Sequence, residues 1–342
     1  MRIVYRGNFG VDFSTESHVA ASAEDAGHLV TRISEKDQGW DITRQAVAHS
    51  AAQGTTMFLW TQTYDYAHRW PALDAIDFLA WCRGEGIPTV GLHLDRWWGL
   101  DRQGQVETEP FFRVAHLFTA DGDSEDLWAG AGVNHHWLAP AVFGRECYRG
   151  EPRPEWKCDI AFIGSHQDYG HREWWPKRKA MLDHLRARHG GRFRCWPDPG
   201  KPAVRGADLN DLMVSAKIVM GDACFADRST RYTSDRLFET VGRGGFLIMP
   251  RTPAYEDQLI DGLDLAWWEH GNYPALDALI DHYLAHDDLR AKIAAHGMET
   301  VKAGHTYRRR VDEMIATLMR NGALRVFENR ARDQVRALFE QA

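Results

Sequence analysis

The stretch of sequence with the most evident chemistry runs from Lys217 to Pro250. An apolar segment there leads into a long polar loop, and the pattern from Asp235 onward predicts a short helix. Ser234 and Arg236 stand at the start of that helix, where free backbone N–H groups and the helix dipole attract phosphate. Glu239 follows about one turn later, where its carboxylate can accept hydrogen bonds from two ribose hydroxyls. These residues predict a nucleotide site.

Small residues follow Glu239 directly. Thr240 comes next, and Gly244 and Gly245 permit a sharp turn and a close approach of the backbone to a ligand. We therefore count Thr240, Gly244 and Gly245 among the candidate ligand-binding residues. The other interpretation is an ordinary glycine cap on the helix, with Glu239 as a solvated side chain. These residues alone leave both interpretations open.

The first half of the chain holds three candidates for proton transfer. His93 and Asp95 stand at the end of the apolar run Ile87–Leu94, and His135 lies farther on. Each is able to take a proton from a hydroxyl group. A metal pair is the competing interpretation of His93 and Asp95, but alternate residues of a strand face opposite sides and no third ligand is evident. We predict no metal site, and buried structural histidines are the other alternative.

Two tryptophans come immediately after this histidine and aspartate. Trp97 and Trp98 have aromatic faces that stack well on sugars, so we expect them to form a wall for a second substrate. Simple packing in the core is the alternative.

Short apolar runs alternate with helical patterns in both halves of the chain, which predicts an α/β fold. The strands and helices of this fold must position the candidate residues. Arg149–Lys157 combines prolines and charge without periodicity and predicts a linker. We predict an N-terminal Rossmann-like domain over residues 1–150, a second one over 151–305, and C-terminal helices over 306–342 that pack across both. Two doubly wound sheets leave a cleft at the carboxyl ends of their strands.

The expected strands are Arg2–Arg6, Leu29–Ile33, Thr55–Trp60, Ile87–Leu94, Val114–Thr119, His136–Leu138, Cys158–Ser165, Phe193–Trp196, Lys217–Met220, Gly245–Met249 and Leu263–Trp267. The expected helices are Ser14–Gly27, Asp41–Gln53, Pro71–Gly86, Asp123–Gly130, Trp174–His189, Ala207–Ala216, Asp235–Gly242 and a long tail helix from Thr306 to Gln341.

Composition limits the classes of protein that this chain can be. Of its 342 residues, 44% are hydrophobic and 26% charged, which is typical of a folded protein. A net charge of −7 argues against non-specific binding of nucleic acid. The chain lacks a run of about 18 apolar residues and a signal-peptide pattern, and its cysteines are widely spaced. We therefore expect a cytoplasmic protein without a membrane span, as a monomer or homodimer.

Three motifs carry a resemblance to a known family. They are S-D-R-L-F-E-T-V-G-R-G-G-F-L-I (Ser234–Ile248), H-T-Y-R-R-R (His305–Arg310) and the strand end F-I-G-S that contains Gly164. Together they resemble the spore-maturation-protein-like (CgeB-type) glycosyltransferases, which are GT-B enzymes of group 1. The resemblance implies a two-lobed GT-B fold and metal-independent transfer of a sugar from a UDP- or GDP-sugar to a hydroxyl acceptor. The nucleotide sugar would be a substrate, and no cofactor is implied.

The resemblance also assigns roles to single residues. Glu239 corresponds to the second glutamate of the family's E-x7-E pattern, which holds the donor ribose, and the first falls on Arg231. Arg231 and Arg228 would then neutralise the diphosphate, while Gly164 and Gly10 would approach the donor phosphates. For Gly10 a plain strand-to-helix turn is the alternative. The acceptor stays open among glycans, small molecules, proteins and modified DNA bases.

Two other functions fit the same residues. One is a nucleotide-sugar epimerase or hydrolase with the same two-lobed architecture. The other is a non-catalytic nucleotide-sugar-binding protein, which Arg231 in place of a glutamate would favour.

Overall fold

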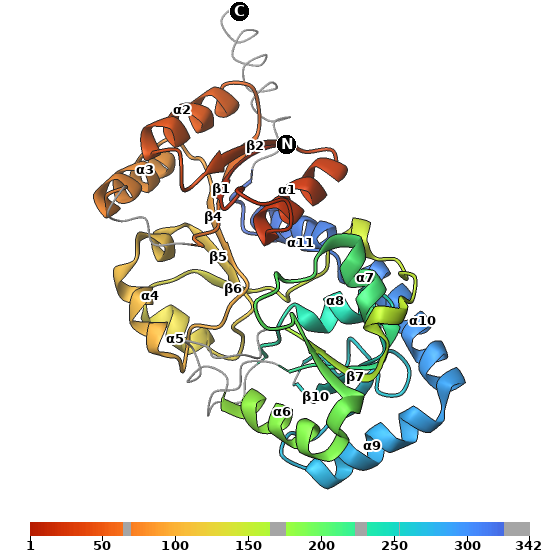
Figure 1. Cartoon of the computed structure of the whole chain (residues 1–342). Helices are drawn as coiled ribbons and strands as arrows, with labels where there is room; N and C mark the ends of the chain where they lie inside the picture. Colours follow the sequence, from red (N-terminus) through yellow and green to blue (C-terminus); the bar gives the residue numbers. More distant parts are fainter. Residues whose placement is uncertain (64–69, 165–175, 223–230, 253, 325–342) are drawn as a thin grey trace, which may run out of the picture.

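The computed structural model describes residues 1–63, 70–164, 176–222, 231–252 and 254–324. These residues form two parallel sheets, each covered by helices on both faces (Figure 1). We call the first sheet and the helices that cover it the N-terminal lobe, and the second sheet with its helices the C-terminal lobe. The fold class is thus the α/β architecture with two doubly wound lobes that the sequence predicts.

The N-terminal lobe has a six-stranded sheet of order β2-β1-β3-β4-β5-β6, in which every neighbouring pair is parallel. Its strands are β1 (Arg2–Gly7), β2 (Leu29–Ser34), β3 (Thr56–Trp60), β4 (Thr89–His93), β5 (His116–Thr119) and β6 (His135–Trp137). Its helices are α1 (Thr15–Asp25), α2 (Trp40–Ala51), α3 (Ala72–Gly84), α4 (Gln105–Thr108) and α5 (Glu125–Gly130).

Strand alternation explains how the helices cover this sheet. Successive residues of a strand face opposite sides, so Ile3 and Tyr5 lie on one face while Val4 lies on the other. The first face packs against α1 and against α11 (Tyr307–Arg320), which comes from the far end of the chain. The second face packs against α2 and α3. Figure 1 shows α11, in blue, beside the red α1.

The C-terminal lobe has a five-stranded parallel sheet of order β11-β10-β9-β7-β8. Its strands are β7 (Cys158–Ile163), β8 (Phe193–Trp196), β9 (Ala216–Met220), β10 (Leu247–Pro250) and β11 (Ala266–Trp268). Its helices are α6 (Pro176–His189), α7 (Gly206–Ser215), α8 (Arg236–Gly242), α9 (Tyr273–Ala285) and α10 (Asp287–Gly304). One face packs against α6, α9 and α10, and the other against α7 and α8.

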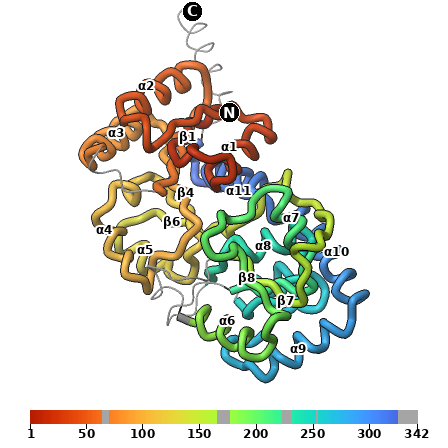
Figure 2. The backbone as a smooth tube through the Cα atoms, in the orientation of Figure 1, coloured from red at the N-terminus to blue at the C-terminus, as the bar shows by residue number. Residues whose placement is uncertain are grey.

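The two lobes share an apolar cluster. Leu100 and Ala139 of the N-terminal lobe pack with Leu237, Phe238 and other residues of the C-terminal lobe. The tube view in Figure 2 shows α7 and α8 on the side of the C-terminal lobe that faces the N-terminal lobe. The lobes therefore meet along a packed seam, and the helix that carries Glu239 lies in it.

Both sheets repeat the same strand order, so both have a switch point where the chain reverses its direction of winding. In the N-terminal lobe the switch lies between β1 and β3, and in the C-terminal lobe between β7 and β9. Ligands of doubly wound folds bind at the carboxyl ends of strands that flank such a point. Functional residues are therefore expected just after Gly7, Trp60, Ile163 and Met220.

Three element predictions differ from the structure for identifiable reasons. The helix predicted from Asp123 begins at Glu125, because Asp123 has a positive φ of 54°. The strand predicted from Gly245 begins at Leu247, because Gly244 has a φ of 80° and ends α8. The predicted tail helix ends at Arg320, before Gly322 with its φ of 68°. Its predicted continuation over residues 325–341 lies outside the described part of the chain.

Candidate functional site

A cavity of about 580 Å³ lies between the lobes at the switch points. The N-terminal lobe lines it with residues that follow β1, β3 and β4 and with the start of α1. The main polar residues there are Asn8, Glu16, His18, Thr61, Thr63, His93 and Asp95. The C-terminal lobe contributes Arg178, Arg205, Tyr232, Ser234, Asp235, Arg236 and Glu239.

A second cavity, of about 450 Å³, lies within the C-terminal lobe. Its walls come from the ends of β7 and β8 and from α7, and they include Gly164, Trp196 and Leu209. Four residues line both cavities, namely Arg205, Asp235, Arg236 and Glu239. The two cavities therefore adjoin at the first turn of α8, and a ligand with two linked parts can occupy both.

Glu239 is half-buried at the junction of the cavities. Its backbone N–H donates to the carbonyl of Asp235 at 2.8 Å, within the first turn of α8. Burial, with a further contribution from the Asp235 carboxylate, raises the pKa of Glu239 to about 7, against the opposing charges of Arg243 and Arg205. A carboxyl group with this pKa changes charge near neutral pH, which is common at binding and catalytic sites.

Two arginines of the cavity are fixed on one buried carboxylate. The Nε of Arg178 donates to Asp222 Oδ2 at 2.6 Å, and Nη1 of Arg236 donates to Asp222 Oδ1 at 2.9 Å. Arg236 Nε also donates to the carbonyl of Ile163 at 3.0 Å, and Ser234 Oγ donates to the carbonyl of Asp222 at 3.0 Å. The shared carboxylate holds both guanidinium groups in fixed positions at the cavity. Such a preorganised cluster suits an anionic ligand.

Gly164 is placed against this cluster. It follows β7 with a φ of 145°, which disfavours side chains. A Cβ at this position would collide with the guanidinium group of Arg236. The predicted residues Glu239, Ser234, Arg236 and Gly164 are thus brought together around the two cavities.

Thr240, Gly244 and Gly245 do not line either cavity, contrary to our expectation. They lie at the far end of α8, where the N–H of Gly244 donates to Val241 at 3.0 Å and that of Gly245 to Thr240 at 3.0 Å. The glycines are therefore a helix cap, the alternative interpretation of this turn.

The other predicted phosphate ligands are also elsewhere. The guanidinium of Arg231 stacks on Trp137, 4.4 Å from the ring centre, and its Nε lies 3.9 Å from Asp123 Oδ1. Arg231 thus bridges the two lobes and does not line either cavity. Gly10 does not line either cavity. Arg228 lies outside the described residues.

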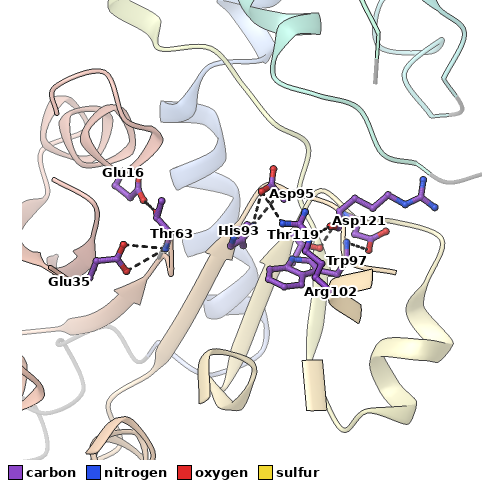
Figure 3. A network of polar contacts seen from close by, with 10 residues as sticks. Glu16, Glu35, Thr63, His93, Asp95, Trp97, Arg102, Thr119 and Asp121 are labelled. Atoms are coloured by element: carbon purple, nitrogen blue, oxygen red, sulfur yellow. Dashed lines mark hydrogen bonds and ion pairs between the residues drawn. The ribbon is translucent and has the colours of Figure 1, made fainter. Parts of the chain in front are cut away.

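His93 and Asp95 line the cavity from the N-terminal lobe, as predicted (Figure 3). The backbone N–H of Asp95 donates to Nδ1 of His93 at 3.3 Å, and Arg102 pairs with the Asp95 carboxylate at 3.3 Å. Burial lowers the pKa of His93 to about 4, so the imidazole is neutral at neutral pH. Desolvation opposes ionisation of Asp95, but the charges of His93 and Arg102 outweigh it and lower the pKa of that carboxyl group.

His135, Trp97 and Trp98 do not lie where we expected them. His135 stacks on Trp128 at 4.7 Å and forms a hydrogen bond with Thr119 Oγ1 at 2.9 Å, and burial lowers its pKa to about 3. The ring of Trp97 packs in the core of the N-terminal lobe, and that of Trp98 packs against Trp128 at 5.2 Å. None of the three lines the described cavities.

Hydrogen bonds to Asp121 explain why the indole rings of Trp97 and Trp98 point into the N-terminal lobe. The Oδ2 of Asp121 accepts a hydrogen bond from the backbone N–H of Trp97 at 2.9 Å (Figure 3). It accepts a second one from the backbone N–H of Trp98 at 2.8 Å. The loop after β4 is thereby tied to the end of β5, and both rings turn into the lobe. Packing, the alternative interpretation, holds for both tryptophans.

Several cavity residues were not predicted from the sequence, namely Arg178, Arg205, Glu16, His18 and Thr63. Arg178 had a usable signal, because it stands in the first turn of the helix that follows the F-I-G-S strand, a usual phosphate position. Arg205 just precedes α7 and had a weaker signal of the same kind. The other three belong to the first 63 residues, where no motif pointed to them.

Among the described residues, no group of three or more His, Cys, Asp or Glu side chains is arranged to hold a metal ion. In that same part of the chain, no helix is long and apolar enough to cross a membrane.

Comparison with known proteins gives a family match for part of the chain. Residues 172–316, which include α6 to α10 and the site around Glu239, match a family model described as glycosyl transferase-like. No curated protein matches the sequence.

Solved structures resemble the whole chain. An alpha-glucosyltransferase in complex with UDP and a 13-mer DNA superposes with a TM-score of 0.63 at 10% identity, covering 93% of this chain and 99% of that one. Anabaena HepE in complex with UDP and glucose gives 0.58 at 11% identity, with coverage of 93% and 99%. A Rickettsia africae glycosyltransferase gives 0.56 at 10% identity, with coverage of 92% and 97%. The chain has the GT-B fold.

The GT-B fold accounts for the position of the cavities. Its two lobes face each other with the carboxyl ends of both sheets toward the cleft, and the larger cavity lies at these ends. The glycosyl transferase-like match covers the part of the C-terminal lobe from α6 onward, which holds Glu239 and Arg236 on one side of the GT-B cleft. Glu16, His93 and Asp95 face it from the other lobe.

Proposed function

We propose that this protein transfers a glycosyl group from a nucleoside diphosphate sugar to a hydroxyl acceptor. The donor would be a UDP- or GDP-sugar and the enzyme would act without a metal, as a group 1 member of the spore-maturation-protein-like type. The UDP complexes of HepE and of the alpha-glucosyltransferase, which share the fold, support a uridine nucleotide as the first ligand to test.

The observation that carries the proposal is the junction of two cavities at Glu239. The inner cavity, of about 450 Å³, has apolar and aromatic walls such as Trp196 and Leu209, which suit a nucleoside. The outer one, of about 580 Å³, opens between the lobes and suits the donor sugar with its acceptor. A nucleoside diphosphate sugar has this two-part form, with the diphosphate as the link.

The link would pass the residues that line both cavities. Glu239, once ionised, would accept hydrogen bonds from the two ribose hydroxyls. Arg236 and Arg205 would face the diphosphate, with Arg178 beside them on the shared Asp222 carboxylate. These guanidinium groups would stabilise the negative charge that develops on the leaving diphosphate, the role that a metal ion plays in other transferases.

The acceptor side would use the polar edge of the N-terminal lobe. Both members of the predicted pair hold a proton weakly at neutral pH, because the pKa of His93 is about 4 and that of Asp95 is lowered from its usual value. The choice between them therefore rests on exposure, and the side chain of His93 is only 13% exposed. Asp95 is ionised and faces the cavity, with a side chain that is 57% exposed. We therefore keep Asp95 as the candidate proton acceptor of the two.

The test is titration calorimetry with UDP and with GDP on the wild-type protein and on Glu239→Gln. The variant keeps the shape of the side chain but loses the charge, so we expect at least about tenfold weaker binding of the preferred nucleotide. Glu299→Gln, an exposed residue of α10, is the matched control and should bind as the wild type does. Unchanged affinity in Glu239→Gln would refute this donor site.

Turnover is tested by the release of UDP or GDP from a panel of their sugars, with and without a hydroxyl acceptor and in the presence of EDTA. We expect acceptor-dependent release that EDTA does not abolish. Release of a changed sugar without any acceptor would instead identify an epimerase or hydrolase.

A further inference from the structure

Glu16 is a carboxylate of the outer cavity that no sequence motif indicated. It stands in the first turn of α1, is only 3% exposed, and lines the cavity from the N-terminal lobe. Its Oε1 accepts hydrogen bonds from the hydroxyl of Thr63 and, at 3.4 Å, from the backbone N–H of Asn8. Thr63 is held in turn by Glu35, whose two oxygens accept its backbone N–H at 3.3 and 3.4 Å (Figure 3).

The backbone is shaped to accommodate this side chain. Gly7 ends β1 directly beneath Glu16, and a Cβ on Gly7 would come within 2.8 Å of Glu16 Cγ and 3.5 Å of the carbonyl of Thr61. A side chain at position 7 would therefore displace Glu16. The glycine at the start of the Gly7–Gly10 loop makes room for a carboxylate at the switch point.

The second carboxylate oxygen is available to a ligand. Across the described part of the chain, Glu16 Oε2 has no hydrogen-bond partner, although the side chain is almost completely buried. A carboxylate oxygen without a protein partner needs water or a ligand to solvate it. Since Glu16 lines the cavity, such a partner would enter from there.

His18 is a second polar side chain of the same helix that lines this cavity. It is 9% exposed and lines the same cavity, and its ring stacks on Phe143 at 4.4 Å. Within the described residues neither ring nitrogen has a hydrogen-bond partner. On α1, one carboxylate oxygen of Glu16 and the ring of His18 thus have no hydrogen-bond partner among the described residues, and both side chains line the same cavity.

The charge of the cavity wall that the N-terminal lobe forms around Glu16 limits the charge of a ligand that can bind there. Among the described residues, every arginine that lines the cavity belongs to the C-terminal lobe, whereas the N-terminal lobe contributes the carboxylates of Glu16 and Asp95. Residues 1–150 hold 12 Lys and Arg against 20 Asp and Glu, a net charge of −8. A bound diphosphate would occupy the arginines of the C-terminal lobe, so a second negatively charged group beside Glu16 would be repelled by that carboxylate.

We propose that Glu16 is an acceptor-binding residue and that the wall around it takes a polyhydroxyl acceptor without negative charge. A hydroxyl or ammonium group of the acceptor donates a hydrogen bond to Oε2, while Thr63 and Asn8 hold Oε1. This subsite rests on the proposed function, because it assigns the acceptor side of the same cavity. We expect sugars that carry an amine to bind most tightly to this subsite, because the ammonium group pairs with the carboxylate. We expect phosphorylated sugars and nucleic acids to bind weakly, because they carry negative charge.

The test is ligand-observed NMR titration of the protein saturated with UDP, using glucosamine, glucose and glucose 6-phosphate as probes. We expect glucosamine to bind most tightly and glucose 6-phosphate at least about tenfold more weakly. Glu16→Gln should weaken glucosamine binding about tenfold through loss of a charge-assisted hydrogen bond. Glu24→Gln is the control, because it makes the same change on the same helix at a side chain that is 41% exposed.

Thr63 supplies a second pair of variants that does not alter a buried charge. Thr63→Val removes the hydroxyl that holds Glu16 and should weaken glucosamine binding, while Thr63→Ser keeps the hydroxyl and should not. Calorimetry on the same samples should show unchanged UDP affinity in Glu16→Gln and Glu24→Gln.

Three results would overturn the subsite: equal binding of glucose 6-phosphate, an unchanged response in Glu16→Gln and Thr63→Val, or no binding of any probe. Failure of the wild type to bind UDP or GDP would count against the proposed function instead. The sugar titrations can be repeated without nucleotide, so the two failures are distinguishable.

Discussion

At the scale of single residues, the donor side depends on a carboxyl group that is close to its point of ionisation. Burial and the neighbouring Asp235 raise the pKa of Glu239 to about 7. A protonated carboxyl group has one fewer strong acceptor oxygen than a carboxylate, so it holds two ribose hydroxyls less well. If Glu239 holds the nucleotide as we propose, its charge state couples nucleotide binding to pH.

We predict that affinity for UDP-glucose or GDP-glucose, whichever binds, increases from about pH 6 to about pH 8. The sign follows from the raised pKa of Glu239, because the binding-competent carboxylate is the minor form below about 7 and the major form above it. The increase can reach about tenfold per pH unit below the pKa. Calorimetry at several pH values measures it, and the diphosphate of a nucleotide sugar does not itself titrate in this range.

The matched comparison is the same pH series on Glu239→Gln, for which we expect a nearly flat profile. His93 does not contribute, because its pKa of about 4 keeps it neutral throughout. An equal pH slope in the variant and the wild type would show that another group titrates.

Sequence reasoning indicated the residues of the proposed donor site better than those of the proposed acceptor site. Ser234, Arg236 and Glu239 stand within six positions of each other, so one strand-loop-helix pattern places them together. Glu16 and Thr63 are 47 positions apart and meet only because β1 and β3 are neighbours in the sheet. Such a meeting depends on strand order, which local patterns do not encode.

At the scale of elements, α8 must hold Glu239 against the cleft although it is only seven residues long. Its support comes from α10, where Gly297 allows close packing on α8. A Cβ at position 297 would collide with the carbonyl of Asp264 and come within 2.7 Å of Val241 Cγ1. Asp264 also accepts hydrogen bonds from His296 and Thr300 of α10, both at 2.8 Å.

We predict that Gly297→Ala lowers the free energy of unfolding by about 1–3 kcal/mol, because the added methyl group overpacks this contact. Gly304→Ala, in the last turn of the same helix, has nothing within 4 Å of the added Cβ and should change stability by less than about 0.5 kcal/mol. Denaturant unfolding of both variants checks the difference. Equal effects would mean that the α8–α10 contact is looser than described.

The order and type of the elements followed from periodicity, whereas several ends did not. The helix predicted from Asp123 failed at its start because that residue adopts a positive φ of 54°. The tail helix stopped at Arg320 because Gly322 takes a φ of 68°. These backbone conformations depend on local turns that a hydrophobic pattern does not reveal. The predicted domain boundaries at residues 150 and 305 stay predictions.

At the scale of the whole molecule, the chain returns to its N-terminal lobe at its end. The Nε of Arg310 donates to the carbonyl of Ala139 at 2.8 Å, and Tyr307, Val311 and Met314 pack on the first sheet. Helix α11 thus follows the C-terminal lobe in sequence but completes the core of the other lobe. This arrangement couples the stability of the two lobes across the cleft.

We predict that Met314→Ala destabilises the protein by about 2–5 kcal/mol, because a completely buried side chain leaves a cavity in the N-terminal lobe. Met319→Ala on the same helix, where the side chain is 48% exposed, should have little effect. Chemical unfolding measured with tryptophan fluorescence compares the two. A small effect at both positions would indicate that α11 is not needed for the core of the N-terminal lobe.

The most direct test of the central claim is a crystal structure of the protein with UDP or GDP. Our account predicts the nucleoside in the inner cavity beside Gly164 and Trp196, both ribose hydroxyls at hydrogen-bond distance from Glu239, and the diphosphate next to Arg205 and Arg236. A nucleotide bound elsewhere, or bound here without contact to Glu239, would contradict it.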